Sequence, residues 1–170
     1  MLDGLTSERL RFRYLSLRDH ATLVEHFSHP ESVHFLPPTG ELDAYARRWI
    51  LRQQARYRRN GGGLYALERI DQPGLIGQAG LIRQNVKGKV EWEVGYHLHP
   101  TVQGKGFASE AAQFCKQVAF EQQLSDSVIS MIHADNLPSQ KVAIRNGMSP
   151  DFALNYEGLP IVVYRVRKEK

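Results

Sequence analysis

One stretch, residues 97–122, constrains the fold of this chain more than any other. It reads as the end of a strand, a turn through Pro100 and two close glycines, and then a helix. Gly104 and Gly106 have no Cβ, so the main chain there can approach a ligand closely. The first N–H groups of the helix, from about Phe107, have no helical partners and carry the positive end of the helix dipole. The stretch therefore favours an anion site, and phosphate is the natural ligand.

Glycines after a strand also occur in tight connections that bind nothing, and the spacing here departs from the familiar phosphate-binding motifs. The P-loop requires G-x-x-x-x-G-K followed by Ser or Thr, and Gly104-Lys105-Gly106-Phe107 has neither the length nor that pair. The dinucleotide-binding fingerprint requires a third glycine at the position of Ser109. Both motifs are excluded.

The pattern over residues 103–108 instead resembles the Q/R-x-x-G-x-G/A pyrophosphate loop of the GNAT superfamily, the acyl-CoA-dependent N-acyltransferases. Other stretches are similar, in the same order, to motifs of its ribosomal-protein-alanine N-acetyltransferase branch. His99 departs from that pattern, where Asp is more usual. These stretches are the opening strand at 7–13, Glu93-Val94-Gly95-Tyr96 with His99-Pro100, Asn136 to Ser139 with Asn146-Gly147-Met148, and Tyr164-Arg165-Val166.

The resemblance covers almost the whole chain and implies a fold and an activity. The implied fold is a single α/β domain over residues 1–170, with a central mixed, mostly antiparallel sheet of about seven strands and four flanking helices. The implied activity is N-acetyl transfer from acetyl-CoA, as cosubstrate, to a primary amine by direct attack in a ternary complex. The amine belongs to a protein N-terminus or to a small molecule. The family often forms homodimers.

Residue periodicity gives the same elements independently. Apolar alternation, short apolar runs and turn residues predict strands, and an apolar stripe at helical spacing predicts helices. The run at 128–133 is typical of a buried parallel strand. The predicted strands cover 10–14, 64–69, 75–82, 90–98, 128–133, 152–156 and 161–167. The predicted helices run from Asp19 to Pro30, from a Thr39 cap to Arg59, from Phe107 onward and from Asn136 to Gly147.

Composition agrees with an ordinary globular domain, with 42% hydrophobic and 24% charged residues. No run of 18 apolar residues and no signal-peptide pattern is present, so we expect a cytoplasmic protein with no membrane partner. The single Cys115 cannot form an internal disulfide. The net charge of +4 does not by itself imply nucleic acid.

The resemblance also assigns the coenzyme contacts. It places the pyrophosphate on backbone N–H groups of the loop, with added charge from Lys105. It places the pantetheine arm along the strand end at His97 and Leu98, with Asn136 holding the arm from the other side. The loop residues are Gln103, Gly104, Lys105, Gly106, Phe107 and Ala108.

An alkyl amine is mostly protonated at neutral pH, so acetyl transfer benefits from a base. Glu93 is the first candidate, because the matching glutamate of the resembled branch lies beside the acceptor. The alternative is a structural carboxylate bonded to a neighbouring strand or an arginine. His97 and Glu91 lie two residues away on the same strand face and could replace Glu93 in this role.

Many GNAT enzymes protonate the departing thiolate with a tyrosine seven residues after the helix asparagine, but Ala143 stands there. The role then passes to Ser139 or to solvent, unless Ser139 only caps the helix.

Cys115 lies among small residues of a helix, which favours a buried side chain over an acyl-enzyme. His97 and His99 alternate along a strand without a third ligand in pattern, so no metal is expected.

Two readings from other classes stay open. The chain could be a non-catalytic acyl-CoA-binding module, which amine turnover assays distinguish. It could also bind RNA through the arginines at 48, 52, 56 and 59, although it lacks interleaved aromatic and basic residues. The same arginines suit a solvated helix face or an acidic substrate. In the resembled family, the loop Pro37 to Glu41, with Tyr45 and Trp49, borders the acceptor, although spacing also places Trp49 in the core.

Overall fold

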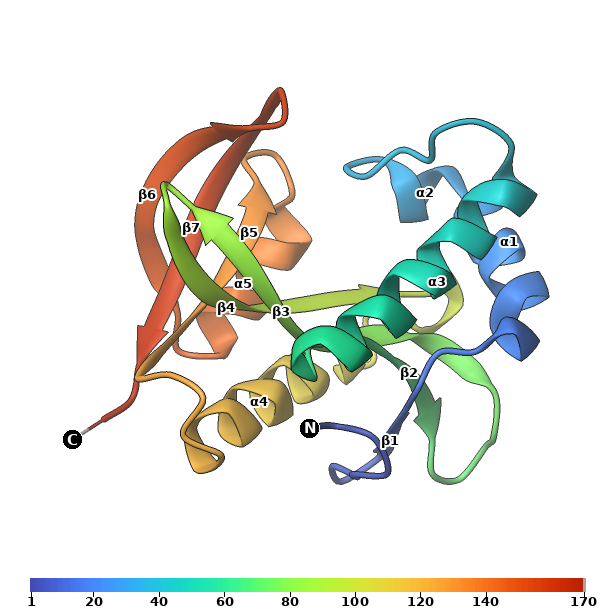
Figure 1. Ribbon diagram of the computed structural model, residues 1–170, viewed down its shortest axis with the longest axis horizontal. Coiled ribbons are helices and arrows are strands. Elements are labelled where there is room, and N and C mark those ends of the chain that lie inside the picture. The colour runs from blue at the N-terminus through green and yellow to red at the C-terminus, as the bar shows by residue number, and fades with distance from the viewer. Residues whose placement is uncertain (170) are drawn as a thin grey trace.

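The computed structural model describes residues 1–169, which form one continuous seven-stranded sheet flanked by helices (Figure 1). The strand order is β1-β2-β3-β4-β5-β7-β6, and every neighbouring pair is antiparallel except β4 and β5. The predicted mixed, mostly antiparallel sheet is therefore confirmed. The strands are β1 (Leu10–Arg13), β2 (Gly63–Arg69), β3 (Leu75–Val86), β4 (Lys89–Leu98), β5 (Ser127–His133), β6 (Ser149–Tyr156) and β7 (Leu159–Arg167).

The structure adds a fifth α-helix to the four that were predicted. The extra turn, α2 (Pro30–Val33), begins where Pro30 was expected only to end the preceding helix. Proline lacks the N–H that the first helical position leaves unbonded, so Pro30 also starts a turn. The expected Thr39 cap is not used, because Glu41 is the N-cap residue of the next helix. The other helices are α1 (His20–Ser28), α3 (Leu42–Asn60), α4 (Phe107–Glu121) and α5 (Leu137–Arg145), with short 3-10 turns η1 (Leu17–Asp19) and η2 (Pro100–Val102).

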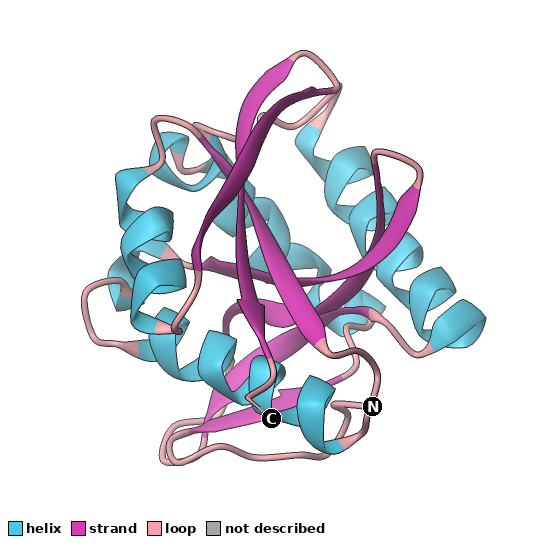
Figure 2. Ribbon diagram, turned by 90° about the vertical axis from the view of Figure 1, so that its left-hand side faces the viewer, coloured by secondary structure: helices cyan, strands magenta, loops and turns pink. Residues whose placement is uncertain are grey.

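The two larger hydrophobic cores fill the two faces of the sheet, and a third, smaller one joins β3, β5 and β7. Figure 2 shows helices on both faces. Successive side chains of β2 point to opposite faces, as strand geometry requires. Tyr65 and Leu67 pack into the core under α4, while Leu64 and Ala66 pack into the core under α1 and α3. The sheet therefore separates a side covered by α4 from a side covered by α1 and α3. Within residues 1–169, no helix combines the length and apolar character needed to cross a bilayer.

A buried ion pair attaches β1 to the segment that leads into α1. The Arg13 guanidinium donates to both carboxylate oxygens of Asp19, at 2.9 and 2.7 Å, and to Glu68 at 2.7 Å. Burial alone would raise the pKa of Asp19, but hydrogen bonds from Arg13 and from the Ser16 amide hold it below 3.8. The carboxylate form therefore stabilises the folded state.

We expect Asp19→Asn to lower the free energy of unfolding by about 3 kcal/mol, because it leaves Arg13 partly buried and underpaired. The folded pKa of Asp19 lies below the unfolded value of about 3.9, so the stabilisation is complete well above that value. The stabilisation is lost as the pH falls through the folded pKa. Urea unfolding of both proteins between pH 7 and pH 2 measures this difference. Asp71→Asn is the control, because the exposed Asp71–Arg69 pair should contribute little. Equal effects of both variants at pH 7 would contradict the prediction.

Candidate functional site

The site is organised by two parallel strands that separate. β4 and β5 share a single paired position, Glu93 with Ile129. Pairing of β3 with β4 nevertheless continues to Leu98, and pairing of β5 with β7 continues to His133. Figure 1 shows the two strands diverging beyond their shared position. The edge of β4 that faces β5 is thus left without a partner strand, and an extended ligand can pair with such an edge.

The glycine loop lies directly after this free strand end. Gly104 and Gly106 both have left-handed backbones, with φ of 75° and 83°, and α4 begins at Phe107. The first N–H to bond inside the helix is that of Glu110, to the Gly106 carbonyl at 3.0 Å, so the preceding amides are free of helical partners. A Cβ placed on Gly104 would meet no atom within 4 Å. The loop therefore offers amides and open space, which suits the phosphate expected there.

The N-terminal segment contacts the glycine loop and the start of α4 through hydrogen bonds that the sequence did not reveal. Glu110 accepts hydrogen bonds from the Ser7 hydroxyl at 2.6 Å and from Arg9 at 2.7 Å. Arg9 also donates to the Lys105 carbonyl at 3.1 Å and lies 4.5 Å from the centre of the Phe107 ring. Arg9 thus adds a cation beside Lys105. About a hundred residues separate Arg9 from these partners, and no local pattern signals such a contact.

The start of α5 faces the other side of the diverging strands. The Asn136 side chain accepts a hydrogen bond from the Ser139 amide at 3.2 Å, so Asn136 caps the helix and Ser139 does not. Burial raises the pKa of Tyr96 to about 12 and a hydrogen bond with the Ser139 side chain opposes the shift, so the Ser139 hydroxyl lies beside the Tyr96 hydroxyl. The Tyr96 hydroxyl donates to the Ser139 carbonyl at 2.9 Å, a bridge from β4 to α5 that sequence reasoning missed. Ala143 is 1% exposed and packs into the core.

Glu93 lies at the point of divergence and is only 9% exposed. One carboxylate oxygen accepts from the Gln84 side chain at 2.7 Å, and the other accepts from the Met131 amide at 3.4 Å. Burial raises the pKa of Glu93, and these hydrogen bonds and the charge of Arg56 only partly oppose the shift. A raised pKa makes a carboxylate a better proton acceptor near neutral pH.

The two neighbours that could replace Glu93 are already engaged. Glu91 accepts from Arg165 at 3.1 and 3.2 Å, so its charge is compensated. The His97 ring bonds through Nε2 to the Ser32 carbonyl, and burial lowers its pKa. Glu93, by contrast, forms no ion pair with a cation of residues 1–169.

The structure places His99, but not His97, in a cluster of three possible metal ligands. Glu25 and His29 of α1 lie beside His99, and one ligand atom from each falls within 4.8 Å of the others. Glu25 bonds the Nε2 atoms of His29 at 2.7 Å and of His99 at 2.9 Å. These three side chains join α1 to the end of β4, and they are the described residues that could hold a metal. The expectation of metal-free catalysis stays a prediction.

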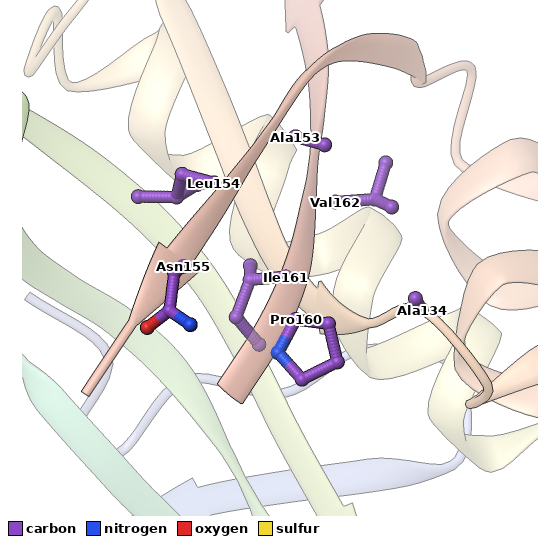
Figure 3. Close-up of a pocket in the computed structure, with 7 residues that line it drawn as sticks. All are labelled: Ala134, Ala153, Leu154, Asn155, Pro160, Ile161 and Val162. Carbon is purple, nitrogen blue, oxygen red and sulfur yellow. The ribbon is translucent and has the colours of Figure 1, made fainter. Parts of the chain in front are cut away.

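A separate apolar cavity of about 320 Å³ lies on the β6–β7 hairpin beside the end of β5 (Figure 3). None of the side chains that line it titrates, so it offers shape and apolar surface but no proton chemistry. The lining residues are Ala134, Ala153, Leu154, Asn155, Pro160, Ile161 and Val162.

Cys115 lies in the middle of α4 and is fully buried. Burial raises the pKa of its thiol far above neutrality, so no thiolate is available to form an acyl-enzyme. We expect Cys115→Ala to keep the wild-type kcat, and the native thiol to resist a disulfide reagent until the protein unfolds. An acetyl group found on Cys115 by mass spectrometry during turnover would contradict this.

Comparison with known proteins leads to one family. Residues 9–149 match the domain described as Acetyltransferase (GNAT) domain. The uncharacterised protein YkkB of Bacillus subtilis (strain 168) is 28% identical over 162 residues, which cover 94% of this chain and 93% of YkkB. An acetyltransferase crystal structure from Agrobacterium tumefaciens str. C58 has a TM-score of 0.84 at 24% identity, covering 99% of this chain and 96% of its own. The ribosomal alpha-N-protein acetyltransferase RimL, in complex with coenzyme A, has a TM-score of 0.76 at 15% identity, with 97% of each chain covered.

Proposed function

Because this chain belongs to the GNAT acetyltransferase family, we propose that it transfers the acetyl group of acetyl-CoA to a primary amine. The observation that supports this most is the opening between β4 and β5, which is followed directly by a glycine loop at the start of α4. An extended arm can pair with the free edge of β4 while its phosphates meet the helix amides.

The residues present suit the coenzyme along its length. Backbone amides of residues 104–108 and the charge of Lys105 would hold the pyrophosphate, and Arg9 lies beside them. The Gln103 amide already donates to the Pro100 carbonyl at 3.2 Å. The strand end at His97 and Leu98 would pair with the pantetheine arm. The Leu98 carbonyl already accepts from the Gln103 side chain at 3.3 Å, so the arm would share that carbonyl. Asn136 keeps its amide donor for the arm, because capping uses only its oxygen.

In the proposed reaction the amine nitrogen bonds to the thioester carbonyl carbon and the carbon–sulfur bond breaks. The amine loses a proton, which Glu93 accepts directly or through water, and the thiolate gains a proton. A thioester is already activated, so orientation and proton transfer account for most of what the protein must supply. Transfer is direct within a ternary complex, since buried Cys115 offers no nucleophile.

Ser139 is our candidate for the proton donor, because it lies at the start of α5 and its hydroxyl is not used to cap the helix. Position 143 faces the core, so the alanine there is not a sign of lost activity. We expect Ser139→Ala to weaken CoA binding by about five- to tenfold, the effect of one lost hydrogen bond of about 1 kcal/mol. Calorimetric titration with CoA measures this, and Ser125→Ala, in the loop before β5, is the control. Wild-type affinity and rate in Ser139→Ala would remove both roles.

The acceptor is a protein N-terminus or a small amine, and a ribosomal protein, as in the resembled branch, is one such acceptor. Incubation of purified protein with acetyl-CoA and a panel of amines and peptides, followed by mass spectrometry, tests the proposal. Acetylated products that require the protein support it. CoA binding without any product would favour a non-catalytic module, and strongly salt-dependent RNA binding alone would favour an RNA-binding protein. A cytoplasmic location and a homodimer stay predictions.

A further inference from the structure

Three arginines of α3 follow one another along one side of the helix toward Glu93. Arg48 donates to the Thr39 carbonyl at 2.7 Å, and Arg52 lies 4.7 Å from the centre of the Trp49 ring. Arg56 is half-buried and donates to Gln53. The spacing of four residues places successive members about 6 Å apart along the helix axis. Their positions are thus fixed by contacts, although Arg48 and Arg52 are exposed.

Among the residues that the structure describes, these guanidinium groups have no acidic partner. Within residues 1–169, none of Arg48, Arg52 and Arg56 has a carboxylate oxygen within 4.0 Å. Four other arginines each form an ion pair, namely Arg9, Arg13, Arg69 and Arg165. Guanidinium groups bind carboxylate and phosphate through paired, planar hydrogen bonds. The row on α3 therefore has unused capacity for an anion.

A cavity of about 250 Å³ opens at the outer end of this row, between the Thr39 loop and α3. Its lining residues are Thr39, Tyr45, Arg48 and Arg52, and none of them is acidic. Burial raises the pKa of the Tyr45 hydroxyl, and the charges of Arg52 and Arg48 oppose that shift. Tyr45 therefore stays protonated at neutral pH and can donate a hydrogen bond. The volume suits a small anionic group rather than a large ring system.

At the inner end of the row, the charges of Arg56 and Glu93 influence each other although the two side chains form no ion pair. Burial, and then repulsion from Arg52, lowers the pKa of Arg56, while the negative charge of Glu93 opposes the shift. Burial raises the pKa of Glu93, and the charge of Arg56 in turn opposes that shift. The row thus connects a cationic cavity at one end with a proton acceptor at the other.

We infer that the acceptor is an amine that also carries a carboxylate or phosphate group, which binds Arg48 and Arg52 while the amine lies toward Glu93. This rests on the proposed amine acetylation, and it narrows the acceptor to one chemical class. A general positive charge on the protein would favour anionic amines of any length. A cavity at a set place on α3 would favour those whose anion and amine lie at one distance from each other.

Matched acceptors test the inference. Each anionic amine is compared with its neutral counterpart: β-alanine with β-alaninamide, 5-aminopentanoate with its amide, phosphoethanolamine with ethanolamine, and a peptide with an acidic second residue with its amide analogue. We expect kcat/KM to be about ten- to a hundredfold higher for the anionic member of the best pair, as one or two charged hydrogen bonds would give. The pair with the largest ratio shows whether carboxylate or phosphate is preferred.

Arginine variants distinguish binding of the anion at a specific site from a general effect of the positive charge of α3. Arg52→Gln and Arg48→Gln should raise KM for the anionic acceptor about tenfold, with kcat, the KM of the neutral partner and the Kd of CoA unchanged. Arg59→Gln is the control, because Arg59 is an exposed arginine of α3 outside the cavity lining. Equal use of both members of every pair by the wild type overturns the inference while acetylation itself stands. An equal loss for both members in Arg52→Gln, or the same loss in Arg59→Gln, also overturns it.

If no amine is acetylated, the proposed function is rejected. A binding measurement then tests whether the anion site exists. In Trp92→Phe protein the remaining fluorescence comes from Trp49, whose ring lies against Arg52. Titration with glutarate and with inorganic phosphate should then give a saturable change that Arg52→Gln abolishes. No saturable change with either anion overturns the anion site itself.

Discussion

Replacing Glu93 by glutamine should lower kcat/KM at pH 7 by a factor of about 10² to 10⁴, the usual contribution of a general base. Glutamine has nearly the same shape, and its oxygen can still accept from the Met131 amide. Its NH₂ group can donate to the Gln84 side-chain oxygen once that amide turns over, so the fold should survive. Burial raises the pKa of Glu93, and a base works only when deprotonated. Wild-type kcat/KM should therefore rise with pH through the raised pKa and then level off.

The Glu93→Gln variant should not show this rise of kcat/KM through the Glu93 pKa. Its kcat/KM should follow only the fraction of neutral amine and rise toward the amine pKa, about 8 for an N-terminal amine and about 10.4 for a lysine-like one. The gap between the two proteins should therefore narrow at high pH. Glu91→Gln is the matched control, because Glu91 lies two residues away but is bound by Arg165. Identical pH profiles for wild type and Glu93→Gln, with CoA affinity unchanged, would remove Glu93 from the mechanism.

Gly104→Ala should raise the Kd for CoA about tenfold or more, which is about 1.4 kcal/mol. The residue has φ of 75°, where a Cβ costs about 1–2 kcal/mol, and its Cβ would project into the open space beside the loop amides. The substitution therefore acts twice, by straining the loop and by keeping a phosphate away from the backbone. Calorimetric titration with CoA measures the change.

Gly158→Ala is the control that measures the effect of backbone strain alone. Gly158 has φ of 87° and open space around its Cβ position, but it lies in the β6–β7 turn. Both variants should lose similar stability, and only Gly104→Ala should lose CoA affinity. Equal CoA affinities for the two variants would mean that the glycine loop does not hold the coenzyme.

Local patterns in the sequence were enough to predict most of the framework. The apolar run of Leu64, Tyr65, Ala66 and Leu67 was enough to predict a strand, and the structure places these side chains in two cores. The glycines at 104 and 106 require an unusual backbone directly before a helix, and both have positive φ. The extra helix α2 was missed because one turn of four residues has no periodicity to detect.

The site depends more on contacts between distant segments. Arg9 reaches the glycine loop across about a hundred residues, and His99 meets Glu25 across 74. Helical spacing shows that Arg48 and Arg52 share a side of α3, but not that this side borders a cavity without acidic neighbours.

The sequence by itself determined the strands, the main helices and the glycine turn, because each follows from residues within one or two turns of one another. The tertiary structure alone decided which side chains the diverging strands bring together, and hence that Glu91 is paired while Glu93 is not. The physical reason is that a side chain's charge state and partners depend on burial and on neighbours from other elements. Those neighbours are fixed only when the sheet and the helices pack.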